Sequence, residues 1–249
     1  MELFGGKLLG FFLVLTRVGA FWAAAPVFSW EVLSVPLKLS IAVLLSLFFT
    51  VLSPPPAPLN PAPIEMVLLL GQEALYGLAL GITAYCLFIV VRMAGQYIEQ
   101  EMGLTMAQVF DPFSGDEGRP LSLILEILFI LLLFSTRSHE LLLQILARSL
   151  ERYPAGVIPN LGTLTEGILR SGSAMFLLAL QLAAPILAVF MLLLVVLAFL
   201  ARIAPESNVL FLSFPLRIGM GLLIVGFFIP YLNEYLQQFA HWLNRMLPF

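Results

Sequence analysis

The sequence predicts an all-α membrane protein built from bent helical hairpins, and composition carries most of this prediction. Charged residues make up only 11% of the 249 residues and hydrophobic residues 61%, whereas roughly a quarter of the residues in a soluble domain are charged. Long apolar runs recur along the chain, and a helix needs about 20 such residues to cross a hydrocarbon core of roughly 30 Å. We therefore expect a multi-pass integral membrane protein.

The apolar runs predict the helices in order. They cover residues 8–25, 37–52, 66–91, 121–134, 174–200 and 209–232. The first run follows Lys7 and ends in small residues, as a secretory signal does, but Arg17 interrupts it and Pro26 would follow the cleavage position. We interpret it as a membrane helix. The second and fourth runs are short for a complete span, which indicates helices that pack against protein.

Prolines indicate where helices bend or stop. The stretch SPPPAPLNPAP, residues 53–63, predicts an extended linker because consecutive prolines cannot join a helix. Two further breaks are expected at ERYPAGVIPNLG and ARIAPESN. Pro185 and Pro215 lie inside the fifth and sixth runs, so bent or broken helices are expected there. Such helices are tolerated at membrane depth where neighbouring protein satisfies the freed backbone groups.

The segments around Pro36 and Pro215 resemble each other. SVPLKLSIAVLLSLFF and SFPLRIGMGLLIVGFF share a Ser-x-Pro-Leu-basic start and a closing Phe-Phe. Two explanations stay open, namely convergence, because proline suits the start of a helix, and duplication of a helical hairpin. We favour convergence.

The charged residues inside the apolar runs include Arg17, Glu73 and Glu126. An ionised side chain at the centre of a bilayer costs about 2.5–3.5 kcal/mol even on insertion scales, so these groups should face protein or water. For Glu73 one interpretation is helix packing beside Gly77 and Gly81, a small-residue pair that lets another helix approach closely. The other makes Glu73 and Glu126 the ion or proton relay of a secondary transporter. We favour packing.

Enzymatic and nucleic-acid functions find little support. The net charge of −3 offers no basic stripe for nucleic acid. A zinc-protease helix would need a second histidine four residues after His139, where Leu143 stands. Asp111 and Asp116 lie in one loop rather than on separate helices, and Ser114 has no histidine near it in sequence to act as a base. We expect no catalytic residue, no metal and no cofactor.

Several motifs, in order and over nearly the whole chain, resemble the FliR family, the export-gate subunit of the flagellar type III secretion apparatus. They begin with Arg17 and continue with AAPVFSWEVLSVPLKL, GQEALYGLALG, GQYIEQEMGLTMAQVFDP, SHELLLQILARSLERYPAG and ARIAPESNVLFLSFPLRIGMGLL. Each motif alone is weak, but their order and spacing make the set specific. A sister family serves virulence secretion systems.

The resemblance implies a non-enzymatic role in a protein-conducting gate. The gate would contain P-type and Q-type subunits together with this chain, would contact other membrane proteins of the export apparatus, and would let unfolded substrates pass. It would lie in the bacterial inner membrane at the flagellar basal body. Residues 1–172 would correspond to a P-type region and residues 173–249 to a Q-type hairpin.

The polar stretch of residues 99–120 contains both aspartates of the chain. Its glycines loosen the backbone, and its phenylalanines are bulky enough to block a narrow passage. The resemblance implies a channel plug here, formed by Met106, Phe110, Asp111, Pro112, Phe113, Ser114 and Gly115. The carboxylates of this loop would then serve only to keep it solvated, and an ordinary surface loop is the alternative. The residues expected to serve helix packing are Arg17, Glu73, Gly77, Gly81, Gly103 and Pro215.

Overall fold

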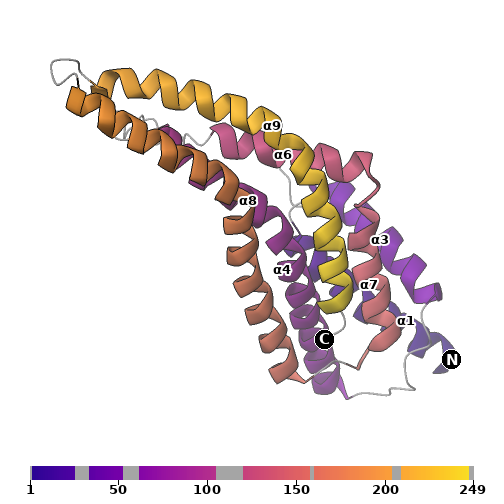
Figure 1. Ribbon diagram of the computed structural model, residues 1–249. Helices are drawn as coiled ribbons and strands as arrows, with labels where there is room; N and C mark the ends of the chain where they lie inside the picture. Colours follow the sequence, from indigo (N-terminus) through magenta and orange to yellow (C-terminus); the bar gives the residue numbers. More distant parts are fainter. Residues whose placement is uncertain are drawn as a thin grey trace, which may run out of the picture. The chain divides into compact units, whose positions relative to one another are not determined.

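The computed structural model describes residues 2–25, 34–52, 62–104, 120–157, 160–203 and 209–246. These residues form helices and their connections, and no strand occurs among them. The helices are α1 (Glu2–Ala24), α3 (Val35–Leu52), α4 (Pro63–Met102), α6 (Pro120–Ser135), α7 (Glu140–Arg152), α8 (Leu161–Ile203) and α9 (Val209–Met246) (Figure 1). The predicted all-α class is confirmed.

Three of these helices, α3, α4 and α8, are long and apolar enough to cross a membrane. Two bent pairs raise the number of candidate spans to as many as five. One pair is α6 with α7, which meet at 69°, and the other consists of the two parts of α9, Ser213–Phe227 and Ile229–Gln237, which meet at 47°. The predicted membrane protein with bent helices therefore agrees with the structure.

The helices are longer than the apolar runs. α8 contains 43 residues, which at 1.5 Å per residue makes it about 65 Å long, roughly twice the thickness of a hydrocarbon core. Pro185 and Pro215 are the positions where a bend or break is expected. α8 continues through Pro185 and α9 continues through Pro215, so neither helix is broken there. The bend in α9 lies beside Pro230, where the missing backbone N–H and the proline ring favour a kink.

The two similar proline segments differ in the structure. Pro36 is the second residue of α3, a position in the first turn where its missing N–H has no intrahelical partner to lose. Pro215 lies in the seventh position of α9, beyond that first turn. A common preference of proline for helix starts therefore explains Pro36 and not Pro215.

The chain divides into two compact units, each assembled from segments distant in sequence. Unit 1 contains residues 1–87, 137–173 and 240–249, and unit 2 contains residues 88–136 and 174–239. Helix α4 contributes its first part to unit 1 and its last part to unit 2. These units do not test the predicted division into a P-type region and a Q-type hairpin, which stays a prediction.

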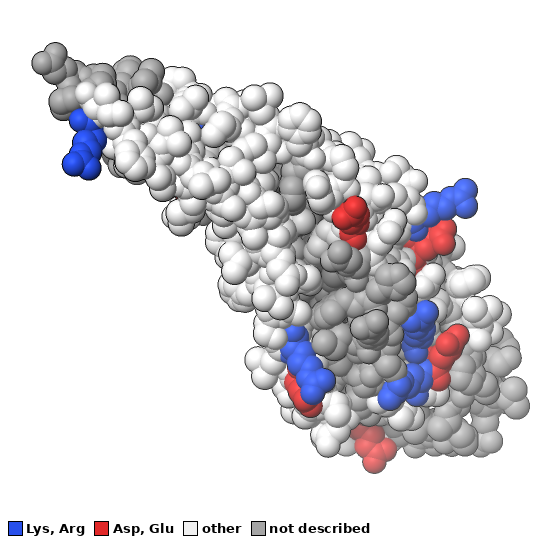
Figure 2. Space-filling model, in the orientation of Figure 1, with Lys and Arg blue, Asp and Glu red and all other residues white. Residues whose placement is uncertain are grey.

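Unit 1 has a core formed by α1, α4 and α7. Large side chains buried there are Leu13, Phe21, Tyr76, Leu80 and Leu146. Helix α7 buries one face and exposes Glu140, Arg148 and Arg152 on the other, the pattern of a helix with one side in water. Figure 2 shows blue and red side chains over the part that Figure 1 draws as α7 and the start of α8.

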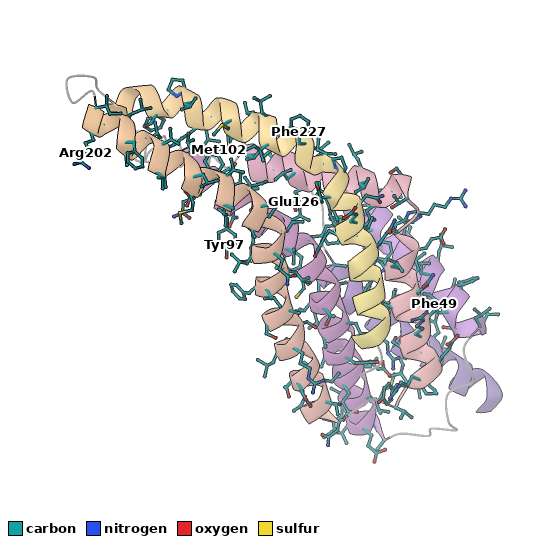
Figure 3. All side chains as sticks on the ribbon, viewed as in Figure 1. Phe49, Tyr97, Met102, Glu126, Arg202 and Phe227 are labelled. Atoms are coloured by element: carbon teal, nitrogen blue, oxygen red, sulfur yellow. The ribbon has the colours of Figure 1, made fainter. Side chains whose placement is uncertain are left out.

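Unit 2 has an aromatic core and exposes many large apolar side chains on its part of α8. An aromatic chain runs through its core, with ring centroids 5.7 Å apart between Phe88 and Phe129 and 6.1 Å apart between Phe129 and Tyr235. Large apolar side chains exposed on its part of α8 include Leu177, Leu180, Met191, Leu192, Val195, Val196 and Phe199. In Figure 2 the described surface of α8 and α9 that leads toward Arg202, which Figure 3 labels, is mostly white. Such a surface needs lipid or protein around it.

Candidate functional site

An ion pair between α1 and α4 is the most prominent polar feature of unit 1. Arg17 Nε donates to Glu73 Oε2 at 2.5 Å, and Arg17 Nη2 donates to Glu73 Oε1 at 2.9 Å. Arg17 is 0% exposed and Glu73 is 1% exposed. The two parallel hydrogen bonds form the bidentate arrangement that matches a guanidinium to a carboxylate. The structure therefore places two of the expected packing residues against each other.

The remaining donors of Arg17 reach the end of α7. Its Nη1 donates to the carbonyl oxygens of Ser149 at 3.1 Å and Tyr153 at 2.8 Å. Carbonyl groups at a helix C-terminus carry partial negative charge, so a cation there is favourable. The guanidinium also lies 4.8 Å from the ring centroid of Tyr76, within the range of a cation–π interaction. Arg17 thus joins α1, α4 and α7.

Glu73 accepts a further hydrogen bond from the turn after α7. The backbone N–H of Gly156 donates to Glu73 Oε1 at 2.8 Å. Gly156 has a φ of +90°, a backbone conformation that glycine adopts without a Cβ penalty. Both ions of the pair therefore have additional hydrogen-bonding partners, the condition under which a buried ion pair is tolerated.

Gly77 and Gly81 allow α4 to lie close to α1. A Cβ atom at Gly77 would overlap the carbonyl oxygen of Arg17, and a Cβ at Gly81 would come within 2.6 Å of the Ala24 Cβ. Glu73, Gly77 and Gly81 follow one another at four-residue intervals, so they lie on the same face of α4. The close backbone approach brings Glu73 within bonding distance of Arg17.

The contacts of this cluster join α1, α4 and the end of α7. Both oxygens of Glu73 accept hydrogen bonds, and the carboxylate is buried. Glu126, the other member of the transporter hypothesis, is half-buried on α6 (Figure 3). It belongs to unit 2, whereas Glu73 belongs to unit 1.

A second buried carboxylate, Glu99, lies in unit 2 and was not among the predicted site residues. Its Oε1 accepts hydrogen bonds from the backbone N–H groups of Leu121 at 2.5 Å and Ser122 at 3.1 Å, and its Oε2 accepts one from Ser122 Oγ at 3.0 Å. The polar composition of residues 99–120 indicates carboxylates that keep a loop in water, Glu99 among them. That interpretation is wrong for Glu99, because it is only 1% exposed and belongs to α4.

A signal for Glu99 does exist in the sequence. Gly95 precedes it by four residues on the same helix, as Gly77 follows Glu73 by four. A Cβ at Gly95 would come within 2.7 Å of Ser122 Cα, so α4 and α6 are in close contact there. A glycine one turn from a glutamate marks both buried carboxylates of α4.

Gly103 ends α4 with a φ of +77°. Its N–H donates to the carbonyl of Gln100 at 3.1 Å, and the N–H of Leu104 donates to the carbonyl of Glu99 at 3.2 Å. These two bonds make a Schellman motif, which requires the left-handed conformation that glycine supplies. A Cβ on Gly103 would lie 3.3 Å from the Phe214 ring, next to Pro215, which is itself exposed on α9.

The predicted plug residues cannot be placed. Met106, Phe110 and Asp111, together with Pro112, Phe113, Ser114 and Gly115, lie outside the described residues. The plug therefore stays a prediction. Among the residues that the structure does describe, no three His, Cys, Asp or Glu side chains lie close enough to hold a metal ion.

Comparison with known proteins gives consistent matches over most of the chain. The family model of bacterial export proteins, family 1, matches residues 8–242. The chain is 30% identical over 231 residues to the flagellar biosynthetic protein FliR of Pectobacterium carotovorum subsp. carotovorum, covering 92% of this chain and 87% of that protein. It is also 30% identical over 220 residues to the FliR protein of Bacillus subtilis (strain 168), covering 86% and 84%.

A translocation protein also resembles the chain. The Yop proteins translocation protein T of Yersinia pestis is 29% identical to it over 232 residues, covering 90% of this chain and 87% of that protein. The similarity extends through both compact units, because it covers most of the chain.

Proposed function

The chain belongs to the bacterial export proteins of family 1, and on this premise we propose that it is a non-enzymatic structural subunit of the flagellar type III protein export gate. The observation that carries the proposal is the match to flagellar biosynthetic proteins over about nine tenths of the chain. The buried Arg17–Glu73 pair supports it, since this pair connects helices and leaves neither oxygen of the carboxylate without a hydrogen bond.

The partners that we propose are P-type and Q-type gate subunits, other membrane proteins of the export apparatus, and unfolded substrates in transit. The apolar surface of α8 and α9 supports a place among other membrane helices. In this proposal residues 1–172 form a P-type region and residues 173–249 a Q-type hairpin, and the assembly lies in the bacterial inner membrane at the flagellar basal body.

Deletion of the chromosomal gene tests the assignment. We expect the deletion to abolish motility and secretion of flagellar proteins into the medium, and a plasmid copy to restore both. The control is a plasmid with Glu166→Gln and Arg170→Gln, which removes an exposed ion pair and should restore both functions fully. Normal filament formation in the deletion strain would contradict the flagellar assignment.

A virulence-type gate is the second candidate, because the Yersinia pestis protein matches the chain at nearly the same identity as the flagellar relatives. The same deletion strain separates the two candidates. Loss of effector secretion with normal filaments would indicate the virulence system, whereas loss of filaments indicates the flagellar one.

Dependence on partners gives a further test. We expect the chain purified alone in detergent to aggregate on size-exclusion chromatography, and coexpression with the P-type and Q-type subunits to yield one defined complex. The reason is the large exposed apolar surface of the hairpin. A stable, monodisperse chain without partners would count against a gate subunit.

The channel plug is a separate part of the proposal. Deletion of residues 110–116, or replacement of Phe110 and Phe113 by glycine, should make the assembled gate leak ions and small solutes, because hydrophobic constrictions close a pore by excluding water. Membrane conductance of cells that express the whole gate measures this. Unchanged permeability in an assembled deletion variant would show that these residues are not the plug.

A further inference from the structure

Glu99 connects the end of α4 with the start of α6 through two different groups. Its backbone carbonyl accepts the N–H of Leu104 in the motif that ends α4. Its side-chain carboxylate accepts the N–H groups of Leu121 and Ser122 near the start of α6. One residue therefore contacts the chain on both sides of residues 105–119.

The Glu99 side chain, which belongs to α4, acts as an N-cap of α6. α6 begins at Pro120, and the first four N–H positions of a helix have no intrahelical partner. Proline has no N–H to satisfy. The next two residues, Leu121 and Ser122, donate theirs to Glu99 Oε1, and a negative charge at a helix N-terminus is favourable.

Close packing of the two helices holds the carboxylate at this position. Gly95 lies one turn before Glu99, and a Cβ atom there would come within 2.7 Å of Ser122 Cα. The third hydrogen bond, from Ser122 Oγ to Oε2, uses the second carboxylate oxygen. Because Glu99 is 1% exposed, water does not compete strongly for these bonds.

We infer that Glu99 is a positioning residue that sets where the chain leaves α4 and where it enters α6. Its function depends on the reach of two acceptor oxygens and not on the exchange of a proton. The inference goes beyond the proposed function, because it holds whatever residues 105–119 do in the gate.

Two substitutions separate reach from charge. Glu99→Gln keeps the length and an acceptor oxygen for the two backbone N–H groups, and its amide can donate to the hydroxyl oxygen of Ser122. Glu99→Asp keeps the charge but is one methylene shorter. A positioning role predicts that the Gln variant behaves like the wild type and that the Asp variant does not. A role of the charge, such as proton relay, predicts the reverse.

Hydrogen–deuterium exchange of the complex purified with its coexpressed partners gives a direct measurement. In Glu99→Asp and Glu99→Ala, amide exchange in peptides that span the start of α6 should accelerate roughly tenfold, as expected for the loss of an N-cap. In Glu99→Gln the change should stay below about threefold. Glu101→Gln is the matched control, since this half-buried carboxylate two residues away should leave exchange unchanged.

Wild-type protection in Glu99→Asp together with fast exchange in Glu99→Gln would overturn the inference, and so would unchanged protection in Glu99→Ala. If the Ala variant does not assemble, the Gln and Asp variants still decide. The exchange measurement does not depend on secretion. A chain that proved to belong to a virulence-type gate instead of the flagellar one would therefore leave this result intact.

Discussion

Helix α4 carries two buried carboxylates that are stabilised in different ways. Glu73 in unit 1 faces a full positive charge, the guanidinium of Arg17. Glu99 in unit 2 faces the backbone N–H groups at the start of α6 and a hydroxyl group. Both are 1% exposed, and both have a glycine one turn away that lets the partner helix come close.

The difference teaches what each carboxylate requires of its neighbours. The negative charge of Glu73 is neutralised by a single residue, Arg17. Loss of Arg17 therefore leaves a buried charge without a counter-ion. The negative charge of Glu99 is stabilised by several hydrogen-bond donors that carry partial positive charges, and each donor contributes a part of the stabilisation. We therefore expect unit 1 to be sensitive to single charge changes and unit 2 to tolerate the loss of charge if the geometry remains.

Arg17→Ala should have the largest effect, because it leaves Glu73 buried without its cation. Breaking a buried pair in this way costs about 3–5 kcal/mol. We expect loss of the assembled complex or a large fall in its thermal midpoint. The double variant Arg17→Met and Glu73→Leu removes both charges and should recover much of the stability. A double variant with a thermal midpoint no higher than that of Arg17→Ala would show that the pair stabilises the complex by more than mutual neutralisation of two charges.

Comparison of Glu73→Gln with Glu99→Gln tests whether the two sites depend on the carboxylate charge to different degrees. At Glu73 the amide leaves the 0% exposed Arg17 with no counter-charge, and the unfavourable charge should cost about 3 kcal/mol. At Glu99 the amide retains most hydrogen bonds, and the cost should be about 1 kcal/mol. Thermal unfolding of the two complexes, side by side, measures the difference. Equal losses would mean that the charge of Glu99 matters as much as that of Glu73.

The sequence allows part of the fold and of the Arg17–Glu73 site to be predicted. The four-residue spacing of Glu73, Gly77 and Gly81 indicates a helix face that packs closely, and the burial of Arg17 follows from its place in an apolar run. The pairing of Arg17 with Glu73 could not be predicted, because 56 residues separate them and only the fold brings their helices together.

The burial of Glu99 is harder to predict from the sequence, for a similar reason. The polar residues Gln100 and Glu101 follow it directly, so the local pattern indicates a loop in water, whereas the structure continues α4 as far as Met102. The burial of Glu99 depends on contact with α6, whose first residues follow more than 20 positions later. Local composition cannot report a contact of that kind.

The glycines next to each carboxylate should show a moderate effect. Gly77→Ala places a Cβ against the backbone of α1, and Gly95→Ala places one against the backbone of α6. Overpacking of this kind costs about 1–3 kcal/mol. Gly71→Ala is the matched control on the same helix, since nothing lies within 4 Å of its added Cβ, and it should stabilise α4 by about 0.5–1 kcal/mol. Thermal midpoints that do not differ between these three variants would remove close approach as the reason for the glycines.

Ser122→Ala should have the smallest effect and tests how the charge of Glu99 is shared. The substitution removes the hydroxyl donor to Oε2 but leaves the backbone N–H groups of Leu121 and Ser122 in place. A single hydrogen bond to a charged group contributes about 1.5–3 kcal/mol, but alanine is the better helix former, so we expect a net loss of about 1 kcal/mol. Ser173→Ala is the control, because this exposed serine on α8 bonds only a backbone carbonyl among the contacts described, and its thermal midpoint should stay the same or rise slightly. If Ser122→Ala lowered the midpoint as much as Arg17→Ala, Glu99 would depend on one partner after all, and the contrast between the two carboxylates would fail.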